Sequence, residues 1–173
     1  PVAVVGWVTS MMQQAEASQK RINEFLKEVP EIKSTSSEPF ELNGNIEFRN
    51  VSLTYDDTKI MALKNINFSI TKGETIAILG KTGSGKSSIV NLVSRLYDVS
   101  DGTIKIDNIP IKDINLNDLR KGIGFVPQDP FLFSDSISNN IKFGYEKATK
   151  QEIISAATKA VVHQNIEGFK DKY

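Results

Sequence analysis

Residues 80–88 read Gly-Lys-Thr-Gly-Ser-Gly-Lys-Ser-Ser, and this stretch decides the fold. The apolar run of residues 75–79 precedes it, and residues 87–97 follow with apolar side chains at helical spacing. This order predicts a buried strand, a glycine-rich turn and a helix in direct succession. Because strands and helices go on alternating further along the chain, we expect an α/β domain with a mainly parallel core sheet.

The glycine-rich turn has the spacing G-x-x-x-x-G-K-[ST] of a loop that binds nucleotide phosphates. Glycines lack Cβ and accept positive φ, so backbone amides can approach a phosphate closely, and the positive end of the following helix adds to them. We expect the Lys86 ammonium to contact the outer phosphates and the Ser87 hydroxyl to bind Mg²⁺. A surface turn without a ligand is the alternative, but the flanking strand and helix favour a nucleotide site. The predicted nucleotide-binding residues of this loop are Gly80, Lys81, Thr82, Gly83, Ser84, Gly85, Lys86, Ser87 and Ser88.

Composition narrows the class of protein. The chain of 173 residues is long enough for one domain with a sizeable core. Its 21 basic and 21 acidic residues balance, so we expect no nucleic-acid partner. There is no cysteine, which excludes disulfides and thiolate zinc sites. The single histidine, His163, cannot form a metal site alone, and we interpret it as structural or exposed.

The N-terminal part divides into two regions. Residues 1–12 are largely apolar, but they are too few to cross a bilayer, which takes about 20 residues. Residues 13–27 turn polar while keeping apolar side chains on one helical face. A buried helix start is one explanation; we favour the end of a last transmembrane helix with its cytoplasmic extension, over residues 1–28. Residues 29–43 carry two prolines and several Ser and Thr, which is typical of a linker.

The remainder is predicted as a core over residues 44–135 and the start of a helical subdomain over residues 136–173. The early strands are expected to form an antiparallel β subdomain, with a bulge or bend around Arg49-Asn50. Thr149 and Glu152 form a capping box that predicts a helix start. The predicted strands are residues 45–55, 63–70, 75–79, 103–106 and 122–126, and the predicted helices of the core are residues 87–97 and 115–121.

In this order, the segments resemble the nucleotide-binding domain of ATP-binding-cassette (ABC) transporters of the exporter type, in which membrane and nucleotide domains share one polypeptide. The resemblance runs nearly end to end, and the ordered set is far more specific than the phosphate loop alone. The segments that carry it are residues 17–26, 46–55, 62–74, 95–107, 126–133 and 140–144.

The resemblance implies roles for individual residues. Tyr55 would stack on the adenine of ATP, although an ordinary strand aromatic is the alternative. Gln128 would contact Mg²⁺ or the attacking water, so that Lys86 and Gln128 are the catalytic residues and Ser87 and Gln128 the metal ligands, with ATP and Mg²⁺ as cofactors. Residues 131–136 would face a coupling helix of a membrane domain, with a buried core patch as the alternative. Asp56 and Asp57 are expected to be solvated turn carboxylates.

The implied function is the ATP-binding part of an ATP-driven membrane exporter, which couples nucleotide state to movement of the membrane domain. The implied partners are a second nucleotide-binding domain, in a homodimer or heterodimer, the coupling helices of the membrane domain and an unknown transported substrate. The implied location is the cytoplasmic face of the cell membrane.

Three features of the family do not occur in the sequence: the Ser-Gly-Gly signature, an apolar strand ending in Asp-Glu, and a switch histidine. The nearest imitation of that strand, Ile-Lys-Ile-Asp at residues 104–107, comes too early and contains a lysine. We therefore expect a truncated domain, with its C-terminal part missing, that hydrolyses ATP only within the intact protein. The alternatives are a nucleotide-gated interaction module without hydrolysis and a soluble P-loop kinase. The kinase is disfavoured because no arginine-rich lid is present.

Overall fold

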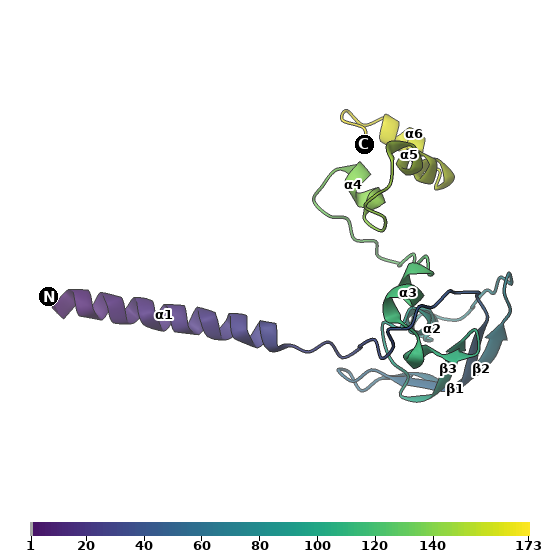
Figure 1. Ribbon diagram of the computed structural model, residues 1–173, viewed down its shortest axis with the longest axis horizontal. Helices are drawn as coiled ribbons and strands as arrows, with labels where there is room; N and C mark the ends of the chain where they lie inside the picture. The colour runs from purple at the N-terminus through teal and green to yellow at the C-terminus, as the bar shows by residue number, and fades with distance from the viewer. Residues whose placement is uncertain (1) are drawn as a thin grey trace. The chain divides into compact units, whose positions relative to one another are not determined.

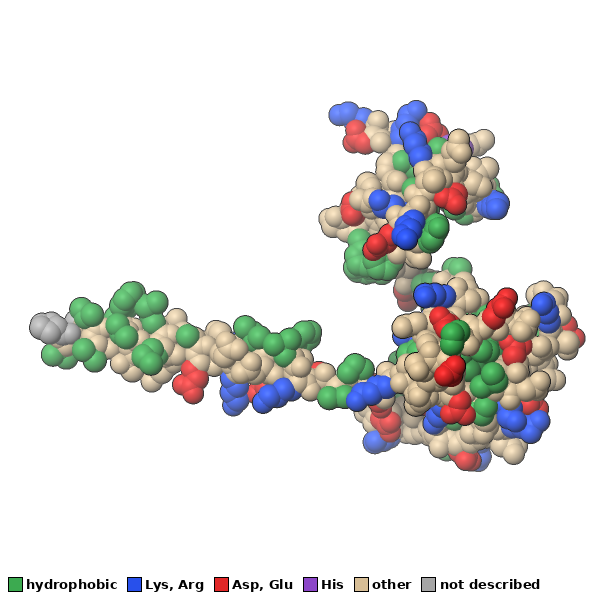
Figure 2. All heavy atoms as spheres, in the orientation of Figure 1, with side chains coloured by type: hydrophobic (Ala, Val, Ile, Leu, Met, Phe, Trp, Pro, Cys, Tyr) green, Lys and Arg blue, Asp and Glu red, His purple; other side chains and the backbone are tan. Residues whose placement is uncertain are grey.

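The computed structural model describes residues 2–173, which fold as two units, one ending at Phe125 and the other spanning Val126–Tyr173 (Figure 1). The first unit begins with the long helix α1, Val2–Lys27. An irregular segment follows it as far as residue 45. Apolar side chains such as Trp7 and Phe25 are exposed along α1 (Figure 2). Within residues 2–173, no helix combines the length and the apolar character that spanning a bilayer requires.

A four-stranded antiparallel sheet organises the first unit. Its order is β2-β1-β3-β4, with β1 at Ile46–Thr54, β2 at Met61–Ile70, β3 at Asp101–Ile106 and β4 at Ile109–Pro110. The antiparallel β subdomain predicted from the early strands is therefore confirmed. Together with the N-terminal helix, it gives the expected mixed α/β fold.

The predicted bend in β1 is confirmed and has a clear consequence for the core. Pairing with β2 shifts register between Phe48 and Val51, and Asn50 between them takes a left-handed φ of 50°. Side chains alternate along a regular strand, so residues three apart would point to opposite faces. Because the bulge inserts an unpaired residue, Phe48 and Val51 are both buried on the same core.

Two helices cover this core, and the first of them begins within the loop of residues 80–88. The helix α2, Lys86–Val93, contributes Leu92, and α3, Leu116–Lys121, contributes Leu119. Between β4 and α3 lies a short 3-10 helix, η1, at Ile111–Asp113. Asn115 caps α3 by accepting hydrogen bonds from two backbone amides, close to the predicted start. The buried core residues are Phe48, Val51, Leu53, Leu63, Leu92, Ile104, Ile106, Ile111, Ile114 and Leu119.

The two strands predicted at residues 75–79 and 122–126 are not formed in the described part of the chain. Neither segment pairs with a neighbour, and Leu79 and Val126 are each 92% exposed. A strand exists only when its backbone amides and carbonyls bond to a partner strand. The parallel part of the expected sheet is accordingly absent from residues 2–173, where the only sheet is the antiparallel one.

The second unit is helical. Its helices are α4 at Ile137–Lys142, α5 at Lys150–Lys159 and α6 at His163–Glu167. The predicted capping box is confirmed: the Thr149 hydroxyl accepts from the Glu152 amide, and the Glu152 carboxylate accepts from the Thr149 amide at 2.7 Å. Half-buried His163 shares a 2.6 Å hydrogen bond between its Nδ1 and the Tyr173 hydroxyl, in keeping with a structural role.

Candidate phosphate-binding site

The loop of residues 80–88 depends on glycine at the position where α2 begins. Gly85 is the N-cap of α2 and has a φ of 87°, in the left-handed region that side chains disfavour. A Cβ at this position would also lie 2.5 Å from the Ala62 carbonyl oxygen and 2.8 Å from Leu63 Cδ2. Conformation and space both require glycine here, because the loop passes directly against β2.

The start of α2 supplies the groups that an anion needs. The first amides of any helix lack a partner within the helix, and the helix dipole places partial positive charge beside them. Gly83 and Gly85 both have positive φ, and they turn the backbone of the loop into the first turn of α2. A loop with such geometry in front of a helix is suited to polyphosphate binding.

Lys86 folds back onto its own loop. Its Nζ donates to the Gly80 carbonyl at 2.8 Å and to the Lys81 carbonyl at 2.7 Å, and lies 3.5 Å from the Ser84 hydroxyl. The ammonium thus lies over the loop formed by the predicted phosphate-binding residues. Neutral carbonyls are weaker partners for a cation than phosphate oxygens are, so a bound polyphosphate would compete well for it.

Tyr55 is held beside this loop, although it lies far from it in the sequence. It directly follows β1, and its backbone closes a turn, donating to the Ile60 carbonyl at 3.0 Å and accepting from the Lys59 amide at 2.8 Å. The Tyr55 hydroxyl lies 2.8 Å from the Ser88 hydroxyl of α2. The structure therefore brings together the predicted aromatic residue and the predicted phosphate loop. Ser87 is exposed in the first turn of α2, whereas Ser88 is buried.

Sequence reasoning missed the contacts made by the segment that follows α2. The Tyr97 ring meets the Tyr55 ring edge to face, with centroids 5.0 Å apart and planes at 83°. Arg95 is only 3% exposed, and its Nε donates to Asp98 Oδ1 at 3.0 Å. Nothing in the local sequence indicated these contacts, because Tyr97 and Arg95 follow a helix and carry no motif of their own.

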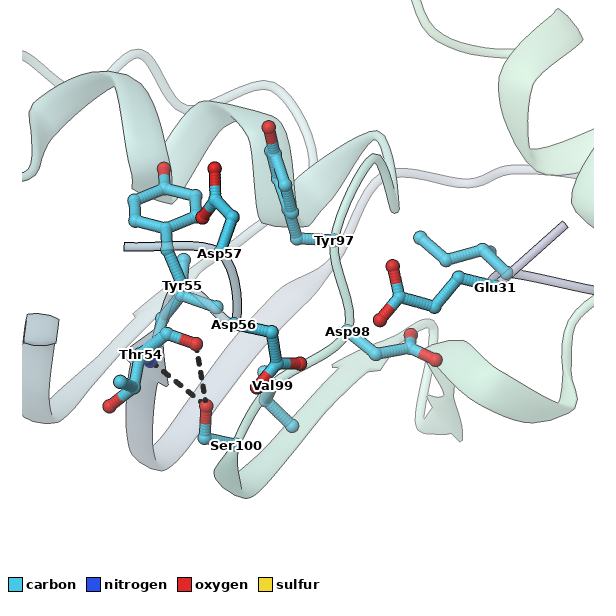
Figure 3. Close-up of a pocket in the computed structure, with 11 residues that line it drawn as sticks. Glu31, Thr54, Tyr55, Asp56, Asp57, Tyr97, Asp98, Val99 and Ser100 are labelled. Atoms are coloured by element: carbon cyan, nitrogen blue, oxygen red, sulfur yellow. Dashed lines mark hydrogen bonds between the residues drawn. The ribbon is translucent and has the colours of Figure 1, made fainter. Parts of the chain in front are cut away.

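A pocket of about 390 Å³ lies beside the two tyrosines (Figure 3). Asp56 and Asp57, in the turn that follows Tyr55, both line this pocket (Figure 3). Glu31 and Asp98 add two further carboxylates to the lining. Because like charges repel, this acidic pocket is unsuited to polyphosphate, whereas the loop with Lys86 offers a positive charge.

The remaining predicted site residue, Gln128, belongs to the second unit. It is exposed in the irregular segment that precedes α4. No hydrogen bond of its side chain is found among the described residues. Its expected contact with Mg²⁺ or water remains a prediction.

The same unit presents an aromatic cluster, formed by Phe131, Phe133 and Phe143. The Phe131 and Phe133 rings meet edge to face at 5.1 Å, and Phe133 and Phe143 lie 4.5 Å apart. Asn140 holds the loop in place, accepting from the Phe133 amide at 2.8 Å and donating to the Phe133 and Ser136 carbonyls. Phe131 is 77% exposed, so this segment is a surface and the buried core patch is wrong (Figure 2).

Comparison with known proteins places these features in a wider context. The sequence model described as ABC transporter matches residues 63–172. The chain is 42% identical over 175 residues to the uncharacterized ABC transporter ATP-binding protein YknV of Bacillus subtilis, covering 100% of this chain and 29% of that protein. It is 39% identical over 175 residues to the ATP-dependent lipid A-core flippase of Syntrophus aciditrophicus, with the same coverage of 100% and 29%.

A solved structure is also similar, that of a bacterial Atm1-family ABC exporter with ATP bound. Its TM-score is 0.84 at 30% identity, covering 98% of this chain and 30% of that one. The chain therefore spans less than a third of the length of the curated relatives described above.

Proposed function

Because the chain belongs to the ABC transporter family, we propose that it is the ATP-binding part of an ATP-driven membrane exporter. The observation that carries the proposal is the joining of Tyr55 to the phosphate loop. Adenine stacks on the Tyr55 ring, and the triphosphate lies on the amides at the start of α2. The 2.8 Å contact between Tyr55 and Ser88 supports this arrangement, since it brings the base platform to the phosphate loop.

Mg²⁺ accompanies the nucleotide. It is a hard cation that prefers oxygen ligands, keeps several waters and commonly takes only one or two protein ligands beside the phosphates. In this proposal the Ser87 hydroxyl of the first unit is a ligand, and its exposure supports access to a solvated ion. Gln128, exposed in the second unit, is proposed to contact Mg²⁺ or the attacking water. The ion would supply charge stabilisation for the phosphates, and Gln128 would orient the attacking water.

The rest of the chain connects this site to its partners. Residues 1–28 continue a membrane helix, residues 29–43 link it to the nucleotide-binding core at residues 44–135, and residues 136–173 begin the helical subdomain. The exposed aromatic cluster supports docking of a coupling helix from a membrane domain. A second nucleotide-binding domain completes the ATPase at the cytoplasmic face of the membrane. The missing signature, Asp-Glu strand and switch histidine imply that these residues alone bind ATP without turnover.

The two alternatives are less well supported. A soluble P-loop kinase leaves α1 and the exporter relatives unexplained. An interaction module without hydrolysis has no relative among the similar proteins described above, one of which carries an ATP-dependent activity in its name.

Isothermal titration of Mg-ATP into the full-length protein tests the proposal. We expect Lys86→Ala to weaken binding at least tenfold, which corresponds to about 1.4 kcal/mol, because the ammonium is the charged partner of the phosphates. Lys64→Ala is the matched control, since Lys64 is exposed on β2 and makes no ion pair among the described residues. Equal affinities for Lys86→Ala and wild-type protein would contradict the proposal.

A further inference from the structure

Ser88 and Tyr55 form a hydroxyl pair that links two elements of the first unit. Tyr55 follows the end of β1, an inner strand of the sheet, and Ser88 lies in the first turn of α2. Their oxygen atoms are 2.8 Å apart, and Ser88 is only 6% exposed. At 6% exposure the Ser88 hydroxyl is largely removed from solvent, from which a phosphate would arrive, and the Tyr55 hydroxyl is its partner.

The Tyr55 ring is fixed from three sides. Its hydroxyl bonds to Ser88, its edge-to-face contact with Tyr97 limits rotation of the ring, and the turn closed by Lys59 and Ile60 holds its backbone. A tyrosine side chain has only two rotatable bonds that set its ring, so these contacts determine where both faces of the ring point.

We propose that Ser88 is a positioning residue for the aromatic platform, and that its hydroxyl holds Tyr55 instead of binding phosphate. The inference rests on the proposed function, because it requires a nucleotide whose base lies on Tyr55. With the link in place, the platform and the phosphate loop stand at a fixed spacing before ATP arrives. Binding then loses less free energy to ordering the side chain.

The link predicts a difference between ligands with and without a base. Mg-ATP uses the platform and the loop together, whereas Mg-tripolyphosphate uses the loop alone. Removing either hydroxyl removes one of the three restraints on the ring but leaves the amides and Lys86 unchanged. A phosphate ligand role for Ser88 predicts the opposite, an equal loss for both ligands.

The experiment titrates Mg-ATP and Mg-tripolyphosphate separately into the full-length protein and its variants. We expect Tyr55→Phe and Ser88→Ala each to weaken Mg-ATP binding about 3- to 10-fold, the usual effect of one hydrogen bond, and to leave tripolyphosphate binding unchanged. The double variant should be no weaker than either single one, because both substitutions remove the same bond. Ser88→Thr keeps a hydroxyl and should retain most of the ATP affinity.

Matched controls separate this effect from general disturbance. Tyr145→Phe and Ser69→Ala make the same chemical changes at exposed positions and should leave both affinities unchanged. ATP affinity that is unaltered in Tyr55→Phe and Ser88→Ala overturns the inference, as does an equal loss for ATP and tripolyphosphate. If the wild-type protein binds neither ligand, the proposed function fails and the inference fails with it.

Discussion

At the scale of single residues, Asp107 has a different role in the structure from the one that its sequence suggests. It ends the sequence Ile-Lys-Ile-Asp, which imitates the acidic strand end of a nucleotide-hydrolysing site. Its carboxylate instead accepts from the backbone amides of Asn43 at 2.7 Å, Gly44 at 3.1 Å and Asn45 at 2.9 Å. The carboxylate therefore holds the chain entering β1 and is structural.

Acid titration should reveal this role of Asp107. Burial raises the pKa of its carboxyl, but the hydrogen bonds from Asn45, Asn43 and Gly44 outweigh it and hold the pKa below the ordinary value of 3.8. A carboxyl with a lowered pKa in the folded state stabilises the protein above its unfolded pKa, and the contribution is lost as pH falls through the folded pKa.

We therefore expect Asp107→Asn to lower the free energy of unfolding by about 1.5–3 kcal/mol at pH 7, the usual value for hydrogen bonds to a charged group. The difference from wild type should shrink as pH falls below 3.8. Urea unfolding at a series of pH values measures it, with Asp113→Asn, an exposed aspartate nearby, as the control. A difference that stays constant down to the lowest pH would contradict this account.

Gly85 allows a second test at a single position. Gly85→Ala places a side chain at a φ of 87° and within 2.5 Å of the Ala62 carbonyl, so we expect loss of Mg-ATP binding and a fall in stability of at least about 1–3 kcal/mol. Gly73→Ala is a close control: its φ is 85°, but a Cβ there meets nothing within 4 Å. Calorimetric titration and thermal unfolding of both variants separate two effects. Disruption of the phosphate loop should occur only in Gly85→Ala, whereas backbone strain should occur in both variants.

At the scale of elements, hydrogen bonds among a few neighbouring residues are enough to define the start of a helix. The capping box at the start of α5 satisfies two amides that the helix itself leaves without partners. The pKa of the Glu152 carboxyl is lowered by its hydrogen bonds from the Thr149 amide and hydroxyl, which favour the charged form. The helix then buries Ile153 and Ala157 in the core of the second unit.

Removing the cap should weaken the second unit alone. We expect Thr149→Ala to cost about 1 kcal/mol, and to speed amide hydrogen exchange in α5 while leaving β1 unaffected. Thr158→Ala is the control within the same helix, because the Thr158 hydroxyl bonds only to the Ile154 carbonyl one turn back. That change should be neutral or slightly stabilising, since alanine favours the helix interior. Equal destabilisation by the two variants would argue against the cap.

At the scale of the whole molecule, the described residues leave apolar surface without a partner. Leu79 and Val126 belong to segments whose sequences suit strands buried on both faces, yet both side chains are almost fully exposed. The aromatic cluster and the apolar side chains of α1 are exposed as well. These surfaces fit a chain that works within the larger assembly proposed above.

Turnover in that assembly should depend on Gln128. We expect Gln128→Ala in the full-length protein to lower the rate of ATP hydrolysis about 10- to 100-fold, because the proposed function assigns this residue to orienting water or Mg²⁺, while ATP affinity stays within about threefold. Gln164→Ala, at an exposed position in α6, serves as the control. ATPase rates and titrations on the same preparations measure both quantities. Unchanged turnover in Gln128→Ala would remove this residue from the catalytic set.

Features that depend on neighbouring residues could be predicted from the amino-acid sequence. The glycine-rich loop and the α2 start, the bend at Arg49-Asn50 and the capping box all follow from φ preferences, side-chain alternation or hydrogen bonds across a few positions. Most of the predicted site could be named for the same reason, since nine of its residues are consecutive, at residues 80–88.

Contacts between groups distant in the sequence could not be predicted, because they depend on how the chain folds. The Tyr55–Ser88 bond joins residues 33 apart, and the Asp107–Asn43 bond joins residues 64 apart, so no local pattern contains either. The strand-like segments at residues 75–79 and 122–126 failed as predictions for a related reason. Their apolar character is local, but a strand needs a partner for its backbone, and the described residues provide none.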